Sequence, residues 1–189
     1  MTLRLFAAVY PPADVAGRVH VACAPLHDAA PTIRWEPPGR LHCTVRFYGA
    51  VEADGVAAIA AGLAEAARLF DPLPVEVRGL GAFPAWGRAR VVWAGVRADP
   101  KFELLHHEIE VRAVALGFEV EGRVFRPHLT LARVPADAEL PVRRAIREAA
   151  RGVRVRERFT VDEVVLMSST AGPTGTRHEA VARAPLGRH

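Results

Sequence analysis

Strand-like segments that follow one another without an intervening helix constrain the fold of this chain most. Residues 75–80 alternate between apolar and polar side chains, and a second strand-like segment, residues 88–96, follows after a short loop. Residues 159–167 and 178–184 form another such pair. Antiparallel strands need only a turn between them, whereas parallel strands need a long crossover, so these pairs favour antiparallel sheets. The sequence therefore predicts an α+β fold rather than a doubly wound parallel sheet.

Helix-like segments fill much of the remaining chain. The clearest one begins after Asp99, which can cap the first turn, and ends before Gly117. Apolar residues at helical spacing predict three further helices, over residues 14–27, 56–70 and 140–149. Pro25 falls inside the first of these, so we expect that helix to kink or to end early.

Composition excludes several classes of protein. The chain has 189 residues, 50% of them hydrophobic and 24% charged, which excludes an intrinsically disordered chain. Its apolar runs are much shorter than the roughly 18 residues of a membrane span, and residues 1–10 resemble a strand rather than a signal peptide. Cys23 and Cys43 cannot form a disulfide framework, so we expect a cytoplasmic protein. We also expect a monomer with no membrane contact and no obligatory protein partner.

The charge of the chain permits an anionic partner without identifying one. The formal net charge is +4, and Lys101 is the only lysine beside 24 arginines. Arginine suits bidentate recognition of phosphate. A base-composition bias of the genome explains the same ratio, so charge alone assigns no function.

One short pattern occurs twice in the chain. His42-Cys43-Thr44 opens one strand-like segment, and His128-Leu129-Thr130 opens another, 86 residues later. Side chains of a strand alternate between its two faces, so each histidine shares a face with its threonine. Two such strands brought together would form a pocket with two imidazoles and two hydroxyls.

This set of side chains suits the cleavage of a phosphodiester. Two histidines can act as general base and general acid on opposite sides of a reacting phosphorus, and each proton transfer typically contributes about 10²–10⁴-fold. Hydroxyls can donate hydrogen bonds to the phosphate oxygens between them. A single His-x-Thr in a strand is common and usually structural, so the functional interpretation depends on the repeat.

The segments around both patterns resemble the two signatures of the two-histidine phosphoesterases. They are Leu41–Gly49 (LHCTVRFYG) and Pro127–Arg133 (PHLTLAR). The branch that they resemble most is the RNA 2′,3′-cyclic phosphodiesterase family of bacteria and archaea, also called 2′-5′ RNA ligases. Further similar segments extend the resemblance over nearly the whole chain: Arg4–Val9, Trp35, Gly81–Pro84 and Arg90–Val96.

The resemblance implies a bilobal α+β fold. Two pseudo-symmetric lobes, each with an antiparallel sheet flanked by helices, would face one another across a central cleft. Residues 1–189 would form a single two-lobed phosphoesterase domain, with one His-x-Thr pattern in each lobe.

The resemblance also implies an activity and roles for individual residues. The family hydrolyses the terminal 2′,3′-cyclic phosphate of RNA to a 2′-phosphate, without a metal ion or another cofactor. His42 would be the proton donor at the leaving 3′ oxygen, and His128 would be the proton acceptor that activates water. Thr44, Thr130 and Arg133 would bind the phosphate. RNA with a 2′,3′-cyclic phosphate terminus is the expected partner.

The alternation of side chains in a strand leaves two arginines in question. Strict alternation places Arg133 on the face opposite His128, so a contact with phosphate requires a bulge or the end of the strand there. The same rule puts Arg46 on the face of His42, which makes it a candidate RNA contact.

Other side chains are candidates for contact with RNA. Trp86 lies in the loop of the middle hairpin, after Phe83-Pro84, and could stack on a base or pack on the domain. The arginines of residues 140–149 (Arg143, Arg144 and Arg147) line one helix face and are either solvated or bound to the RNA backbone. His178 stands where many members of the family carry an aromatic residue, so base stacking is not expected at that position.

Three alternative functions stay open at this point. The chain could act on another cyclic nucleotide-type phosphate or ligate 2′-5′ bonds weakly. It could instead be a non-catalytic module that binds RNA ends. Finally, His20, Cys23 and His27 have a helical spacing that could bind zinc, although Pro25 interrupts that helix.

Overall fold

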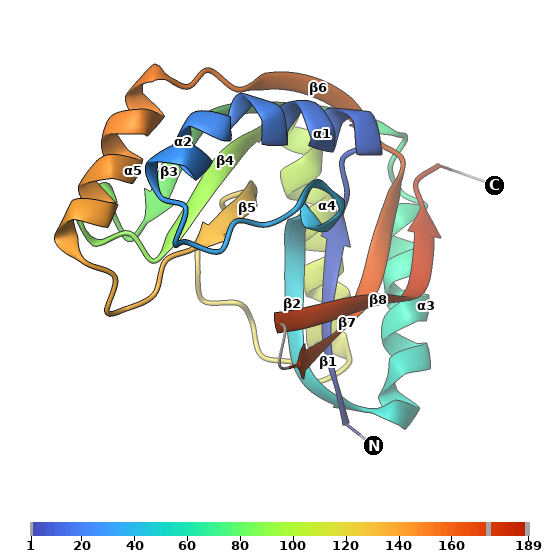
Figure 1. Ribbon diagram of the computed structural model, residues 1–189. Helices are drawn as coiled ribbons and strands as arrows, with labels where there is room; N and C mark the ends of the chain where they lie inside the picture. Colours follow the sequence, from blue (N-terminus) through green and yellow to red (C-terminus); the bar gives the residue numbers. More distant parts are fainter. Residues whose placement is uncertain (1, 173–174, 188–189) are drawn as a thin grey trace.

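The computed structural model describes residues 2–172 and 175–187 (Figure 1). The strands are β1 (Thr2–Val9), β2 (Cys43–Glu52), β3 (Leu73–Phe83), β4 (Val91–Ala98), β5 (His128–Arg133), β6 (Arg156–Val161), β7 (Glu163–Gly172) and β8 (Gly175–Pro185). The α-helices are α1 (Ala13–Ala22), α2 (Ala24–Ala29), α3 (Val56–Ala67), α4 (Pro100–Ala115) and α5 (Leu140–Gly152). Three short 3₁₀ helices complete the set: η1 (Pro38–Arg40), η2 (Ala53–Gly55) and η3 (Trp86–Arg88).

The strands form one sheet that is divided into two similar halves. Their order is β6-β3-β4-β5-β2-β1-β7-β8, and every neighbouring pair is antiparallel. The halves meet between β5 and β2, where Cys43 and Leu129 are the only registered partners among the described residues. Each half has four strands, and its innermost strand begins with or directly after a histidine of the repeated pattern. The α+β prediction and the two-lobed arrangement are thus confirmed.

The helices divide between the two lobes without following the order of the chain (Figure 1). Helices α3 and α4 pack against each other and cover β2, β7 and β8, whereas α1 packs on β6 and α2 packs on α5. The N-terminal helices therefore cover the lobe that contains the second histidine. This exchange ties both halves of the chain into one main hydrophobic core.

Local signals in the sequence explain where α1 ends and where α4 begins. Pro25 fits the first turn of a helix, and the chain breaks at Cys23 into α1 and α2, as expected for that region. The Asp99 carboxylate accepts a hydrogen bond from the Lys101 amide at 2.8 Å, which caps α4. None of the described helices has the length and hydropathy needed to cross a membrane.

Candidate active site

The pairing of β2 with β5 brings the two His-x-Thr patterns together. Cys43 and Leu129 are opposite each other and fully buried in the core below the sheet. In antiparallel strands this register, continued by one residue in each direction, sets His42 beside Thr130 and Thr44 beside His128. Directly opposed residues have Cβ atoms about 4.5–5.5 Å apart, so this register predicts that the four side chains share one face of the sheet at its centre.

Both imidazoles are oriented by the same backbone device. Nδ1 of His42 donates a hydrogen bond to the Arg40 carbonyl at 2.7 Å, and Nδ1 of His128 donates one to the Arg126 carbonyl at 2.6 Å. A carbonyl only accepts, so these bonds fix the proton on Nδ1 and leave Nε2 to exchange a proton with a substrate. The two carbonyls stand two residues before their histidines, which is a correspondence that the sequence reasoning missed. The repeated spacing Arg-x-His-x-Thr was the signal that could have revealed it.

Aromatic rings from the neighbouring strands support each histidine. The Phe6 ring lies 5.2 Å from the His42 ring, and the Tyr10 ring lies 5.4 Å from it. Beside His128, the Phe83 ring lies at 5.1 Å and the Trp93 ring at 6.1 Å. These contacts restrict the rotation of both imidazoles and remove water from one side of each.

A bulge in each strand follows the His-x-Thr pattern at the same position. Two adjacent residues of β1, Ala8 and Ala7, pair with Thr44 and Arg46, so Val45 is the extra residue in β2. Two adjacent residues of β4, Trp93 and Val92, pair with Thr130 and Ala132, so Leu131 is the extra residue in β5. A bulge reverses the alternation that follows it.

The bulge in β5 settles the position of Arg133. The bulge turns Arg133 back to the face of His128. Strand alternation alone had required either a bulge or the end of the strand for Arg133 to contact phosphate, and the structure has the bulge. Arg133 is exposed there, and its charge lowers the pKa of both His42 and His128. The corresponding residue after the bulge in β2 is Phe47, which pairs with Phe6 on the cleft face.

The electrostatics of the cleft favour neutral imidazoles in the free protein. Burial is the main cause that lowers the pKa of His42 to about 4, with smaller contributions from His178 and Arg133. Burial also lowers the pKa of His128. His178 of β8 packs edge-on against His42, with ring centres 5.3 Å apart, so a third imidazole belongs to this site.

The prediction that Arg46 contacts RNA is wrong for this structure. The bulge at Val45 turns Arg46 away from His42, and only 2% of its surface is exposed. Its guanidinium forms an ion pair with Glu110 of α4 and donates a hydrogen bond to the Glu119 carbonyl at 2.8 Å. Arg46 therefore ties β2 to α4 and to the segment that leads toward His128.

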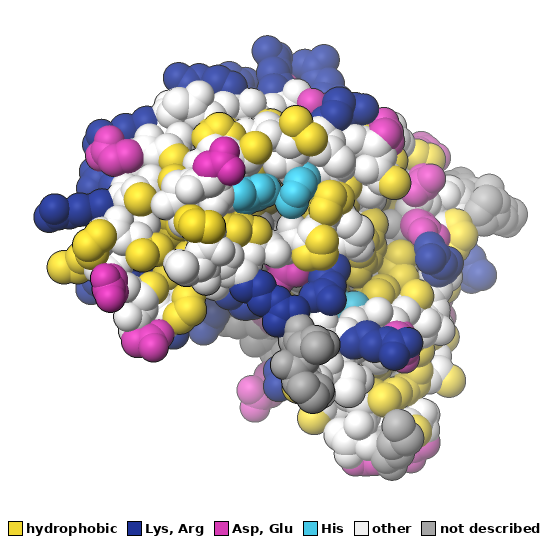
Figure 2. All heavy atoms as spheres, viewed as in Figure 1, with side chains coloured by type: hydrophobic (Ala, Val, Ile, Leu, Met, Phe, Trp, Pro, Cys, Tyr) yellow, Lys and Arg dark blue, Asp and Glu magenta, His cyan; other side chains and the backbone are white. Residues whose placement is uncertain are grey.

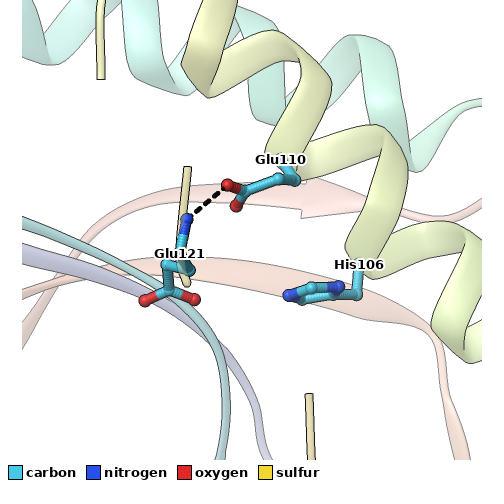
Figure 3. Close-up of side chains that lie close together, drawn as sticks. All are labelled: His106, Glu110 and Glu121. Carbon is cyan, nitrogen blue, oxygen red and sulfur yellow. Dashed lines mark hydrogen bonds between the residues drawn. The ribbon is translucent and has the colours of Figure 1, made fainter. Parts of the chain in front are cut away.

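The carboxylate of Glu110 lies in a cluster that otherwise resembles a metal site (Figure 3). His106 and Glu110 extend from α4 toward Glu121, whose backbone amide donates a hydrogen bond to Glu110 at 2.8 Å. Among residues 2–172 and 175–187, this is the only group of three potential ligands close enough to share an ion. The Arg46 guanidinium supplies a positive charge beside Glu110 in this cluster.

The zinc alternative for His20, Cys23 and His27 is not supported. The rings of His20 and His27 lie 4.5 Å apart, but Cys23 is fully buried and does not converge with them on a common point. Burial raises the pKa of the Cys23 thiol to about 11, which disfavours the thiolate that zinc needs.

Two of the remaining sequence candidates lie outside the cleft. Arg143 is buried and donates hydrogen bonds to the carbonyls of Ala138, Ala89, Pro135 and Ala136, so its role is structural. Trp86 lies in η3, partly packed on the core, and lines a separate groove beside Arg147.

Comparison with known proteins identifies the family. A model described as the 2′-5′ RNA ligase superfamily matches residues 11–173. The chain belongs to this superfamily. Proteins named RNA 2′,3′-cyclic phosphodiesterase are similar to it, among them one from Aeropyrum pernix that is 40% identical over 101 residues. That match covers 53% of this chain and 56% of the relative. The chain therefore spans little more than half the length of that relative.

Longer matches and solved structures agree with this assignment. A relative of the same name from Aquifex aeolicus is 28% identical over 159 residues, which cover 82% of each chain. A crystal structure from Thermus thermophilus superposes with a TM-score of 0.79 at 27% identity and covers 98% of this chain and 100% of the other. E. coli LigT in its apo form superposes with a TM-score of 0.75 at 25% identity, covering 98% of both chains. The superfamily fold thus extends over the whole described structure.

Proposed function

We propose that this member of the superfamily hydrolyses the terminal 2′,3′-cyclic phosphate of RNA to a 2′-phosphate. The observation that carries the proposal is the β2–β5 register, which pairs Cys43 with Leu129 between two histidines that backbone carbonyls orient. Relatives named RNA 2′,3′-cyclic phosphodiesterase support this choice of substrate.

In the proposed reaction, the two histidines transfer one proton each. Nε2 of His128 takes a proton from water as the water oxygen attacks phosphorus. The bond between phosphorus and the 3′ oxygen breaks, and protonated His42 delivers its Nε2 proton to that oxygen. The product has a 2′-phosphate and a free 3′ hydroxyl. No step requires a metal ion, so the proposal includes metal independence.

The remaining side chains of the cleft would bind the phosphate. The hydroxyls of Thr44 and Thr130 can donate hydrogen bonds to its non-bridging oxygens, and Arg133 adds positive charge on the same face. His42 must be protonated to act as the acid, but its lowered pKa keeps it neutral at pH 7 in the free protein. The negative charge of the phosphate is therefore needed to protonate it. An anionic phosphate raises the pKa of a nearby histidine, so substrate binding would protonate His42 when it is required.

The assignment of acid and base follows the family resemblance, since the same kind of backbone hydrogen bond orients both histidines and does not distinguish them. The test is incubation with RNA that carries a 2′,3′-cyclic phosphate, in the presence of a chelator, with separation of 2′- from 3′-phosphate products. We expect only the 2′-phosphate product, at an undiminished rate. Exclusive 3′-phosphate would reverse the roles of His42 and His128, and binding without turnover would support a non-catalytic RNA-end module instead.

A further inference from the structure

A second groove lies outside the cleft and has a strongly basic lining. Its volume is about 630 Å³, and it is formed by β3, η3, the C-terminal half of α5 and the segment that enters β6. Its charged and aromatic residues are Arg78, Trp86, Arg147, Arg151, Arg154 and Arg156. No Asp or Glu is among the described residues that line it. Lys and Arg side chains gather over α5 and over β6 in Figure 2.

The positive charge of this groove is only partly neutralised by its neighbours. Arg151 pairs with Glu148 at 2.9 Å, and Arg156 pairs with Glu76 at 2.7 Å. Both arginines are more than half exposed, and such surface pairs contribute only about 0–1 kcal/mol, so a phosphate can compete for them. Five arginines against these two glutamates leave a surplus of three positive charges.

Two of the arginines are directly available to a ligand. Arg78 and Arg147 are exposed, and neither forms an ion pair with a described carboxylate. Arg154 donates hydrogen bonds to the carbonyls of Arg151 and Val153, which hold its guanidinium in place at the groove. The fixed guanidinium of Arg154 lies in the same groove as the exposed Arg78 and Arg147. This arrangement favours a ligand with several phosphates, because each phosphate can accept two parallel hydrogen bonds from one arginine.

The groove and the cleft share strand β3. Leu80 lines the groove, and Phe83 of the same strand contacts the His128 ring. The two residues are about 10 Å apart along the strand at ~3.3 Å per residue, and their side chains point to opposite faces, so the RNA would pass around β3 to reach the groove. Trp86 lies three residues beyond Phe83, in the 3₁₀ helix after β3, and also lines the groove.

We propose that this arginine groove binds the phosphate backbone of the single-stranded RNA that precedes the cyclic end, with Trp86 stacking on one of its bases. The inference rests on the proposed function, because the cleft must hold the cyclic phosphate for the adjoining nucleotides to reach the groove. Aromatic side chains interleaved with basic ones are typical of surfaces that bind single strands without sequence preference. The groove would make the enzyme favour oligonucleotides over mononucleotides.

The experiment compares two substrates with the same reacting group. One is a 2′,3′-cyclic mononucleotide, and the other is a single-stranded RNA of about ten nucleotides with a 2′,3′-cyclic end, within the ~4–16 nucleotides that one small domain contacts. The variant carries Arg78→Ala and Arg147→Ala together, and Arg68→Ala is the control because Arg68 is exposed at the end of α3, outside the groove. Trp86→Leu tests the stacking separately.

For the oligonucleotide, we expect the double variant to lower kcat/KM by at least about tenfold and the control variant to leave it unchanged. The wild-type protein and all the variants should hydrolyse the cyclic mononucleotide with the same kcat/KM. The slope of log kcat/KM against log salt should become shallower by about 1.4, since each lost phosphate contact of a single strand accounts for ~0.7.

Several outcomes would overturn the inference. The double variant could lose activity equally on both substrates, or it could keep its full activity and salt dependence on the oligonucleotide. Tighter binding of duplex than of single-stranded RNA would exclude the proposed occupant. If the wild-type protein hydrolysed neither substrate, the proposed function would fail, and fluorescence anisotropy with the labelled oligonucleotide would still decide whether the two arginines bind it.

Discussion

Replacing Arg46 by Met tests the most consequential buried charge in this protein. Arg46 is 2% exposed and its partner Glu110 is 12% exposed, so the substitution leaves a carboxylate buried without its counter-charge. Removing one partner of a buried ion pair typically costs about 3–5 kcal/mol. For a chain of this length, each kcal/mol shifts Tm by roughly 2–4 °C, so we expect Tm to fall by about 6–20 °C.

The assay is urea and thermal unfolding of matched variants. Arg151→Met is the control, because Arg151 and Glu148 form an exposed pair whose loss should cost less than about 1 kcal/mol. The double variant Arg46→Met with Glu110→Leu removes both charges and should recover most of the stability. If Arg46→Met cost no more than Arg151→Met, the buried ion pair would not be the contact that holds β2 to α4.

Three further predictions concern the cleft. His42→Ala and His128→Ala should each reduce kcat for a 2′,3′-cyclic phosphate by about 10²–10⁴-fold while the fold, followed by circular dichroism, is kept. Gly81→Ala should lower activity without a large loss of stability, because a Cβ at this position would overlap the Trp93 ring and displace it from His128; the quenching of tryptophan fluorescence reports the shift. Burial lowers the pKa of His42 from 6.5 to about 4 in the folded protein. Between pH 4 and pH 6.5 the imidazole is therefore protonated in the unfolded chain and neutral in the folded one, so the free energy of unfolding should rise with pH over this range. His42→Gln should flatten that rise in urea titrations, and an unchanged slope would contradict the assigned pKa.

The sequence was sufficient for most of the elements and for the pair of histidines, although the single strand predicted over residues 159–167 is divided between β6 and β7. Short loops between strand-like segments identified antiparallel pairs, and the repeated His-x-Thr identified the two strands that meet at the centre of the sheet. Both conclusions depend on local patterns, which are visible in one segment at a time.

The two bulges could not be read from the sequence. A bulge arises from the pairing of a strand with its neighbour, and Val45 and Leu131 differ in no local feature from ordinary strand residues. Without the bulge in β2, Arg46 is expected in the cleft, whereas it is buried against α4. The contribution of His178 was equally hidden, because β8 reaches His42 only through the order of strands β2-β1-β7-β8.

The most direct test of the central claim is a change of leaving group. In a cyclic phosphate whose 3′ bridging oxygen is replaced by sulfur, the leaving thiolate needs no proton, while the attacking water still needs a base. The proposed roles predict that His42→Ala hydrolyses this substrate at nearly the wild-type rate and that His128→Ala remains as impaired as on the oxygen substrate. Equal impairment of both variants on the sulfur substrate, or rescue of His128→Ala alone, would contradict the assignment of His42 as acid and His128 as base.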